Sequence, residues 1–326
     1  MILAGHVPPQ EWHPWIDDLH FYGTKISDLA PLSNLTGLRN LDIQMTHITD
    51  LSPIENLTAL EMLNFSETNI INLFPVTKLK SLQSLAFRET NINDITALTD
   101  LKALINLEFQ RTPINDLSPI KSLTALKTLG LSETEVSDLS PIYNISSIES
   151  LFFSKTKISD LAAIANLKAL TNLYFDDTMV RDLTPLAGLK MLTHLDFGGT
   201  AVTDLSPLSE LNALESLNIS GTSVCDLTPI SNLPALESLW ISRTNISDLT
   251  PIASLNSLDA LGIQGTKVSS LFSIAGLKAL QTIFIGSEQP GDEFAQQLGP
   301  NFSYMEERHG VNESHDVIRR LFLLND

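Results

Sequence analysis

The sequence predicts an α/β solenoid, a stack of 22-residue repeats that each supply one short strand and one tight turn. The first observation behind this prediction is one threonine that returns every 22 residues without an insertion or deletion. An extra residue in one repeat would displace the buried side chains of every later repeat, so strict spacing is typical of stacked repeats. The twelve positions are Thr24, Thr46, Thr68, Thr90, Thr112, Thr134, Thr156, Thr178, Thr200, Thr222, Thr244 and Thr266.

The second observation is a frame of leucines around each threonine. The copy at residues 126–142 follows the pattern L-x-x-L-x-L-x-x-T-x-[IV]-x-D-L-S-P-[IL]. Its central L-x-L alternates apolar and variable residues, which predicts a short strand with one buried face. Leu41 and Ile43 are one such inward pair. In six repeats phenylalanine takes the second inward slot, and we expect these rings to stack in the core: Phe65, Phe87, Phe109, Phe153, Phe175 and Phe197.

The third observation is the Ser/Thr-Pro pair in the return segment, for example Ser52-Pro53 and Ser118-Pro119. It predicts a helix N-cap at the hydroxyl residue, with proline in the first helical position. Few residues separate this proline from the next strand, so each helical element should be a single 3₁₀ turn. We also expect the threonine hydroxyls to bond the backbones of neighbouring repeats and to form a continuous ladder.

The repeats divide the 326 residues into three parts. Residues 1–15 are predicted to form an N-terminal cap in which Trp12 and Trp15 cover the apolar flank of the first repeat, since terminal repeats need a cover. A binding role for these tryptophans is the alternative. Residues 16–288 form a solenoid of about 13 repeats. Residues 289–326, which include an apolar helical stripe over 317–324, are either a C-terminal cap or the start of a further domain.

The frame resembles the leucine-rich repeat family, in the 22-residue class shared by bacterial internalins and a eukaryotic regulatory subunit of protein phosphatase. The likeness covers residues 16–285, with threonine at all twelve positions where the family usually has asparagine. It implies a right-handed leucine-rich-repeat solenoid shaped as a horseshoe, with a parallel β-sheet on the concave face and short 3₁₀ turns on the convex face. It also implies that ligands are proteins held on the concave face.

Composition limits the class of partner. The formal net charge is −18, from 20 basic and 38 acidic residues, which argues against binding nucleic acid or an anionic membrane. Much of this acidity belongs to the aspartate of the frame. The single Cys225 excludes a disulfide framework within the chain. The sequence shows no signal peptide or membrane-spanning segment, so we expect a cytoplasmic monomer, with translocation by another route as the alternative.

The sequence carries no catalytic motif and no metal-ligand spacing among its seven histidines, so we expect neither an enzyme nor a bound cofactor or metal. The leading hypothesis is a non-catalytic recognition module for a protein or peptide. The alternative is the sensing or substrate-recruiting arm of a larger enzyme, an effector or a signalling GTPase, whose catalytic domain lies outside this chain.

The candidate binding residues lie at outward strand positions, which the stacking leaves free to vary. Phe152 and Tyr174 should be neighbours, about 5 Å apart. Exposed aromatic rings with a charged rim are typical of interface hot spots. The alternative is that such rings only cover neighbouring aliphatic edges. The full predicted partner-binding set is Phe152, Tyr174, Asp176, Asp177, His194, Asp196 and Trp240.

Overall fold

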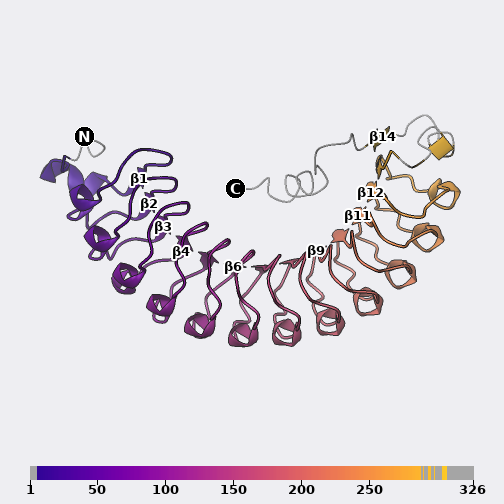
Figure 1. Cartoon of the computed structure of the whole chain (residues 1–326), viewed down its shortest axis with the longest axis horizontal. Coiled ribbons are helices and arrows are strands. Elements are labelled where there is room, and N and C mark those ends of the chain that lie inside the picture. The colour runs from indigo at the N-terminus through magenta and orange to yellow at the C-terminus, as the bar shows by residue number, and fades with distance from the viewer. Residues whose placement is uncertain (1–5, 288, 290–292, 295–296, 298–302, 307–326) are drawn as a thin grey trace. The chain divides into compact units, whose positions relative to one another are not determined.

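The computed structural model describes residues 6–287, 289, 293–294, 297 and 303–306. The chain divides into two compact units, residues 1–201 (the first unit) and residues 202–326 (the second unit). Both are built from 22-residue repeats, each a strand followed by a 3₁₀ turn (Figure 1).

The described residues of the first unit, 6–201, form nine three-residue strands that pair in parallel with their neighbours along the chain. The register keeps the repeat of 22, so that Leu19 pairs with Leu41. In Figure 1 the strands of this unit line one side and the coiled turns the other. The strands are β1 (Asp18–His20), β2 (Asn40–Asp42), β3 (Met62–Asn64), β4 (Ser84–Ala86), β5 (Asn106–Glu108), β6 (Thr128–Gly130), β7 (Ser150–Phe152), β8 (Asn172–Tyr174) and β9 (His194–Asp196).

The second unit continues the same pattern with β10 (Ser216–Asn218), β11 (Ser238–Trp240), β12 (Ala260–Gly262) and β13 (Thr282–Ile285). A further parallel strand, β14 (Ser303–Glu306), pairs with β13 through Thr282 and Ser303. This offset is 303 − 282 = 21 residues, one fewer than in the frame. The sequence did not predict β14 because residues 301–308 carry no copy of the leucine pattern.

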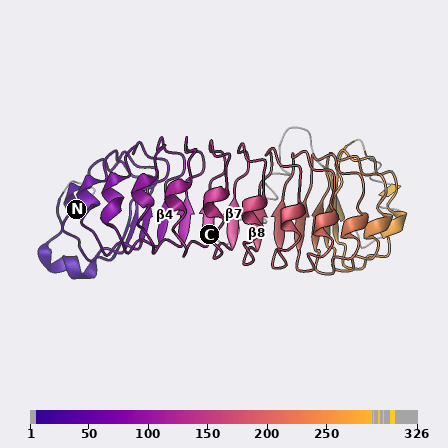
Figure 2. The same ribbon diagram turned by 90° about the horizontal axis from the view of Figure 1, so that it is seen from below.

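The predicted 3₁₀ turns are confirmed, and Figure 2 shows those of the first unit in a row along one face. Each is short because only a few residues connect it to the next strand. In the first unit they are η2 (Gln10–Trp15), η3 (Ala30–Leu32), η4 (Ser52–Ile54), η5 (Phe74–Lys78), η6 (Thr96–Leu98), η7 (Ser118–Ile120), η8 (Ser140–Ile142), η9 (Ala162–Ile164) and η10 (Thr184–Leu186). In the second unit they are η11 (Ser206–Leu208), η12 (Thr228–Ile230), η13 (Thr250–Ile252) and η14 (Phe272–Ile274).

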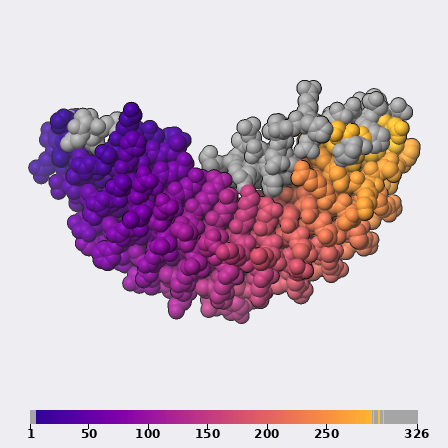
Figure 3. Space-filling model, viewed as in Figure 1, coloured from indigo at the N-terminus to yellow at the C-terminus, as the bar shows by residue number. Residues whose placement is uncertain are grey.

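The core between strands and turns consists of the leucines of the frame and the predicted phenylalanines. Phe65 and Phe87 stack with ring centroids 5.6 Å apart, and Phe153 and Phe175 stack at 5.4 Å. All six core phenylalanines are completely buried. In the space-filling view of Figure 3 the side chains of the first unit leave no opening between successive repeats. Removing one ring from this column would therefore open a cavity.

The threonine column works differently from the prediction of a ladder between repeats. The Thr46 hydroxyl donates to the carbonyl oxygen of Ile43 in its own repeat at 2.7 Å. The same bond to the residue three positions earlier recurs in every repeat from Thr46 to Thr266. The predicted ladder is wrong because a hydroxyl is too short to span the roughly 4.8 Å between strands. Each threonine instead closes the turn that follows its own strand.

The predicted N-cap is also wrong, because in ten of the described turns the aspartate of the frame, not the serine, accepts the first backbone N–H. Asp50 Oδ1 accepts a hydrogen bond from the backbone N–H of Ser52 at 2.8 Å and from its hydroxyl at 2.7 Å. Asn72 Oδ1 does the same for the N–H of Phe74 at 2.9 Å. A carboxylate two residues earlier in the chain reaches the first free N–H of the turn more easily than the serine reaches its own. Equivalent caps come from Asp28, Asp94, Asp116, Asp138, Asp160, Asp182, Asp204, Asp226 and Asp248.

The residue before each threonine has a left-handed backbone, which the sequence did not reveal. These twelve residues have φ between 54° and 71°, and only four of them are glycine. The conformation places the backbone N–H against the next repeat, as when Lys155 donates to the Asp176 carbonyl oxygen at 2.8 Å. Left-handed geometry costs a non-glycine residue about 1 kcal/mol. The eight non-glycine residues with this geometry are Met45, Glu67, Glu89, Arg111, Glu133, Lys155, Asp177 and Arg243.

The two ends of the chain differ from the central repeats. The predicted tryptophan lid is wrong, because Trp12 is 50% and Trp15 84% exposed. The segment instead closes on itself, with His13 Nε2 bonded to the Pro8 carbonyl oxygen at 3.0 Å. Near the other end, Gln289 is buried and donates from Nε2 to the Ile263 carbonyl oxygen at 2.9 Å. The predicted apolar stripe at 317–324 lies outside the described residues, and the assignment of both ends as caps stays a prediction.

The left-handed column predicts an unusual order of stability at position 155. Lys155→Gly and Lys155→Ala both remove the side chain, but only glycine relieves the backbone strain at φ 55°. We expect the glycine variant to have the larger free energy of unfolding, by about 1 kcal/mol, in urea titrations. Gly23→Ala should lower the free energy of unfolding by a similar amount. No atom lies within 4 Å of the added Cβ, so this change adds backbone strain at φ 66° without a steric clash. A more stable alanine variant at 155 would contradict the strain argument.

The capping aspartates predict a loss of stability in acid. Hydrogen bonds from the Ser52 hydroxyl and N–H lower the pKa of Asp50 below its ordinary 3.8, and Asp138 is lowered in the same way by Ser140. A lowered pKa in the folded state stabilises the fold above pH 3.8, and this contribution is lost as the pH falls through the folded-state pKa. Asparagine already caps the turn at Asn72, so Asp50→Asn and Asp138→Asn should keep their caps. In these variants the urea midpoint should fall less between about pH 5 and about pH 2. Asn72→Asp should steepen this fall, and an unchanged slope in both variants would refute the assignment.

Candidate functional site

The predicted site lies on the outward face of β7, β8 and β9 in the first unit. In a strand the first and third residues face the same side, and in these strands the middle leucine is buried. We call the side formed by first and third residues the strand face. The register places Phe152 beside Tyr174 and Tyr174 beside Asp196. Three consecutive strands therefore bring two rings and a carboxylate side by side.

Phe152 and Tyr174 form a stacked pair, as predicted. Their ring centroids are 5.1 Å apart with an interplanar angle of 18°. Both side chains are half-buried, so part of the pair is accessible to solvent. Such a pair contributes about 1 kcal/mol beyond the area it buries, which holds the two rings in one orientation.

The tyrosine of this pair stays protonated over the physiological pH range. Burial raises the pKa of the Tyr174 hydroxyl well above its ordinary value of 10.0, and the negative charge of Asp196 raises it further. Both effects disfavour the phenolate, one by removing water and the other by repulsion. The phenol is thus a neutral hydrogen-bonding group beside a negative charge.

The acidic residues of the charged rim that the sequence predicted differ in exposure. Asp176 and Asp196 are only 6% and 5% exposed, while Asp177 is exposed. Asp196 Oδ1 accepts a hydrogen bond from the Gly198 N–H at 2.9 Å. Asp177 belongs to the left-handed column, and its carboxylate lies over Gly199, which has no Cβ to obstruct it. The adjacent repeat thus buries two of the three carboxylates, which sequence alone could not show.

Two further groups flank the pair. His194 is half-buried at the start of β9, and its Nδ1 is 2.9 Å from the Thr193 hydroxyl. On the other side, the Gln110 side chain lies over Gly130, the register neighbour of Phe152. The sequence indicated Gln110 only as part of a mixed-charge surface on the earlier repeats and did not place it in this site. The signal that could have found it is a glycine at an outward strand position, which leaves room for a neighbouring side chain.

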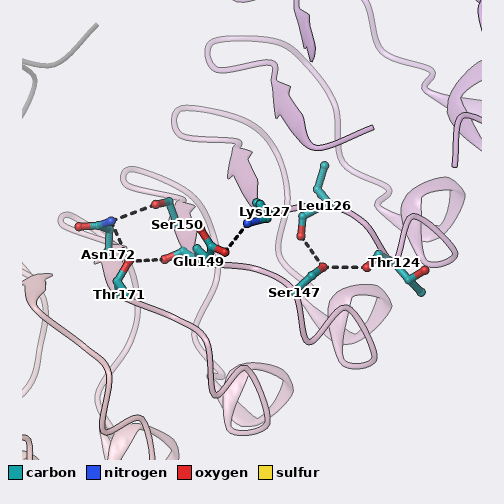
Figure 4. A network of polar contacts seen from close by, with 8 residues as sticks. All are labelled: Thr124, Leu126, Lys127, Ser147, Glu149, Ser150, Thr171 and Asn172. Carbon is teal, nitrogen blue, oxygen red and sulfur yellow. Dashed lines mark hydrogen bonds and ion pairs between the residues drawn. The ribbon is translucent and has the colours of Figure 1, made fainter. Parts of the chain in front are cut away.

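Polar contacts tie the strands together beside the aromatic pair (Figure 4). Asn172 Nδ2 donates to the Ser150 and Thr171 hydroxyls, each at 3.0 Å. The Thr171 hydroxyl donates to the Glu149 carbonyl oxygen at 3.0 Å, and Lys127 Nζ donates to the Glu149 carboxylate at 2.7 Å. Three of these four bonds cross from one repeat to the next near the start of β7 and β8, so they help to hold the two rings at a fixed separation.

Trp240, in the second unit, is not the exposed aromatic that the sequence predicted. Its side chain is 2% exposed, and its ring packs at a tilt against Phe284 with centroids 4.8 Å apart. The physical reason is Gly262, the register neighbour of Trp240, over which the indole lies. We therefore assign Trp240 to packing.

The described portion of the chain supplies two observations about chemistry. It contains no group of three or more histidine, cysteine, aspartate or glutamate side chains placed to hold a metal ion. No helix in the same portion has the length and apolar character needed to span a bilayer. The repeat frame, the parallel ladder and the 3₁₀ turns together define a leucine-rich repeat protein.

Comparisons with known proteins give the more particular assignment. No family model and no curated protein matches the sequence. Internalin InlF of Listeria monocytogenes matches with a TM-score of 0.86 and 27% identity, over 95% of this chain and 93% of that chain. Internalin InlC2 of the same species is 30% identical over 58% of this chain and 84% of that chain, with a TM-score of 0.56. The chain belongs to the internalin-like class of leucine-rich repeat proteins.

A more distant structure shares the fold alone. The ectodomain of the Arabidopsis thaliana receptor kinase GASSHO1/SCHENGEN3, solved in complex with CASPARIAN STRIP INTEGRITY FACTOR 2, has a TM-score of 0.64 and 15% identity. The match covers 92% of this chain and 45% of that chain.

The packing of Trp240 predicts the effect of adding one methyl group beside it. Gly262→Ala would bring a Cβ into the indole, with Cζ3 only 3.0 Å away. We expect a loss of about 1–3 kcal/mol in free energy of unfolding, measured by urea titration, because overpacking forces side chains off their preferred rotamers. Gly276→Ala is the matched control, since nothing lies within 4 Å of its added Cβ. Equal effects of the two substitutions would show that Trp240 does not occupy this space.

Proposed function

We propose that this chain is a non-catalytic recognition module that binds a protein or peptide on its strand face, the concave face of the predicted horseshoe. The observation that carries the proposal is the stacked Phe152–Tyr174 pair, half-exposed at positions where core packing requires no aromatic ring. Clustered aromatic side chains with nearby polar groups supply most of the energy of many interfaces. The proposed site comprises Phe152, Tyr174, Asp176, Asp177, His194 and Asp196.

The rigidity of the surroundings supports this proposal. Stacking, strand pairing and the contacts of Asn172 and Thr171 fix both rings before any partner arrives. A preorganised surface loses little conformational entropy on binding, so more of the contact energy appears as affinity. A strand face held in this way suits a partner recognised by shape and by a few anchor residues.

The charge and the fold favour a protein partner over other classes. A net charge of −18 repels nucleic acids and anionic lipid surfaces. The plant receptor ectodomain is an example of the same fold holding another molecule. These points support a protein or peptide ligand and leave its identity to experiment.

The site predicts that two alanine substitutions remove binding without unfolding the chain. Peptides selected from a random phage-displayed library on the wild-type chain should bind Phe152→Ala/Tyr174→Ala at least about ten-fold more weakly. The melting temperature should change little, because both side chains lie outside the leucine core.

The matched control removes rings of the same type from the opposite side of the first unit. Phe74, 69% exposed in η5, and Tyr143, 48% exposed after η8, lie on the turns. Phe74→Ala/Tyr143→Ala should leave the selected peptides bound at wild-type affinity. A library that yields no peptide dependent on Phe152 and Tyr174 overturns the proposed function.

A further inference from the structure

Two buried oxygen atoms beside the aromatic pair have no hydrogen-bond partner among the described residues. They are Asp176 Oδ2 and Gln110 Oε1. A buried acceptor without a donor costs free energy, and the cost is larger for a carboxylate than for an amide. Native structures contain few such atoms, and each one needs a physical reason.

The two acceptors lie in different repeats near the rings. Asp176 follows Tyr174 by two residues, in the turn directly after β8. Gln110 lies over Gly130, which is the register neighbour of Phe152. From repeat to repeat the order is thus the Gln110 amide oxygen, the Phe152 ring, and then the Tyr174 ring with the Asp176 carboxylate in the same repeat. Asp196, beside Tyr174 in the register, adds a second negative charge.

Three basic side chains of the preceding repeats pair with glutamates. Arg111 bonds Glu89 at 2.5 Å and Glu133 at 3.2 Å, and its guanidinium pKa is raised by these partners. Lys155 lies 4.0 Å from the Glu133 carboxylate, and Lys157 pairs with Glu135. The first unit therefore gathers negative charge and aromatic faces at this point, while its nearby cations neutralise other carboxylates.

We infer that the partner presents a cationic side chain to this site, with its charged group over the Phe152–Tyr174 rings and its N–H donors directed to Asp176. The inference rests on the proposed function and names the chemistry of the ligand. A cation is attracted to the face of an aromatic ring, and the attraction grows when water is excluded. Arginine fits best, because its planar group stacks on a ring while its five donors reach oxygens on more than one side.

A neutral or acidic anchor would not satisfy the site. An aliphatic side chain could cover the rings, but it would leave the Asp176 oxygen buried and unpaired. An acidic side chain would face both Asp176 and Asp196 and be repelled. The unpaired acceptor of Asp176 and the aromatic pair together therefore favour a cationic anchor over an aliphatic or an acidic one.

The test uses peptides selected on the wild-type chain that lose binding to Phe152→Ala/Tyr174→Ala. Each is resynthesised with arginine replaced by citrulline and lysine by N-acetyl-lysine, which remove the charge and keep the shape. We expect each dependent peptide to contain an arginine or lysine whose neutralisation weakens binding at least ten-fold. Asp176→Asn should weaken the unmodified peptides by a similar factor and have little effect on the neutral ones.

The control for Asp176→Asn is Asp160→Asn, the same change of charge at a cap on the turn side, where Asn72 shows that asparagine holds the turn. It should leave peptide affinity unchanged. Asp176→Asn should also keep or raise the melting temperature, because it removes an unpaired buried charge.

The outcomes separate this inference from the proposed function. Peptides that need Phe152 and Tyr174 but bind equally well after citrulline or N-acetyl-lysine replacement overturn the cation and leave the proposed function intact. A loss with citrulline that Asp176→Asn does not reproduce overturns the role of Asp176. A set of peptides that ignores the aromatic pair overturns both.

Discussion

The alignment of each repeat with the next through backbone hydrogen bonds is the constraint on which the rest of this structure depends. The parallel ladder does not stop at the three-residue strands, since the left-handed residue beyond each strand also donates to the next repeat. The Met45 N–H donates to the Ser66 carbonyl oxygen at 3.0 Å, and Glu67 to that of Arg88 at 2.8 Å. A single insertion would break this alignment for all later repeats, which explains the constant spacing of 22 residues. The strain of eight left-handed side chains is offset by the bonds that it aligns.

The same constraint separates the two faces of each unit by function. The turn face carries a column of aspartates that cap the 3₁₀ turns, so a large part of the net charge of −18 is structural. The threonine hydroxyls that follow the strands each bond a carbonyl oxygen of their own turn. The strand face is free to vary, because each side chain there contacts only its neighbours in the adjacent repeats. Recognition is accordingly proposed there.

On the strand face, the size of the neighbouring residue decides whether an aromatic ring is exposed. Trp240 has glycine beside it in the next repeat, and the indole lies down over that glycine and is buried. Phe152 and Tyr174 have each other, so the two rings stack and both stay half-buried. All three residues occupy the same slot of the frame, yet only Phe152 and Tyr174 stay partly exposed and belong to the proposed binding surface. The unpaired Asp176 oxygen near the pair is the basis of the preference for positive charge that we infer for that surface.

The sequence by itself determined the elements that depend on period and residue type. The strands from β1 to β13, the buried phenylalanine column and the 3₁₀ turns follow from spacing and alternation, which fix the face of every side chain. It also placed Phe152 beside Tyr174, because strands in register bring equivalent positions together. Only the tertiary structure decided which group bonds which. The bonding of each threonine within its own repeat, the aspartate caps, the exposure of Trp15 and the burial of Trp240 and Asp176 all depend on distances between neighbouring side chains. A repeating pattern fixes the side toward which each side chain points. The particular residue in the next repeat decides which groups that side chain can reach and how far it is buried.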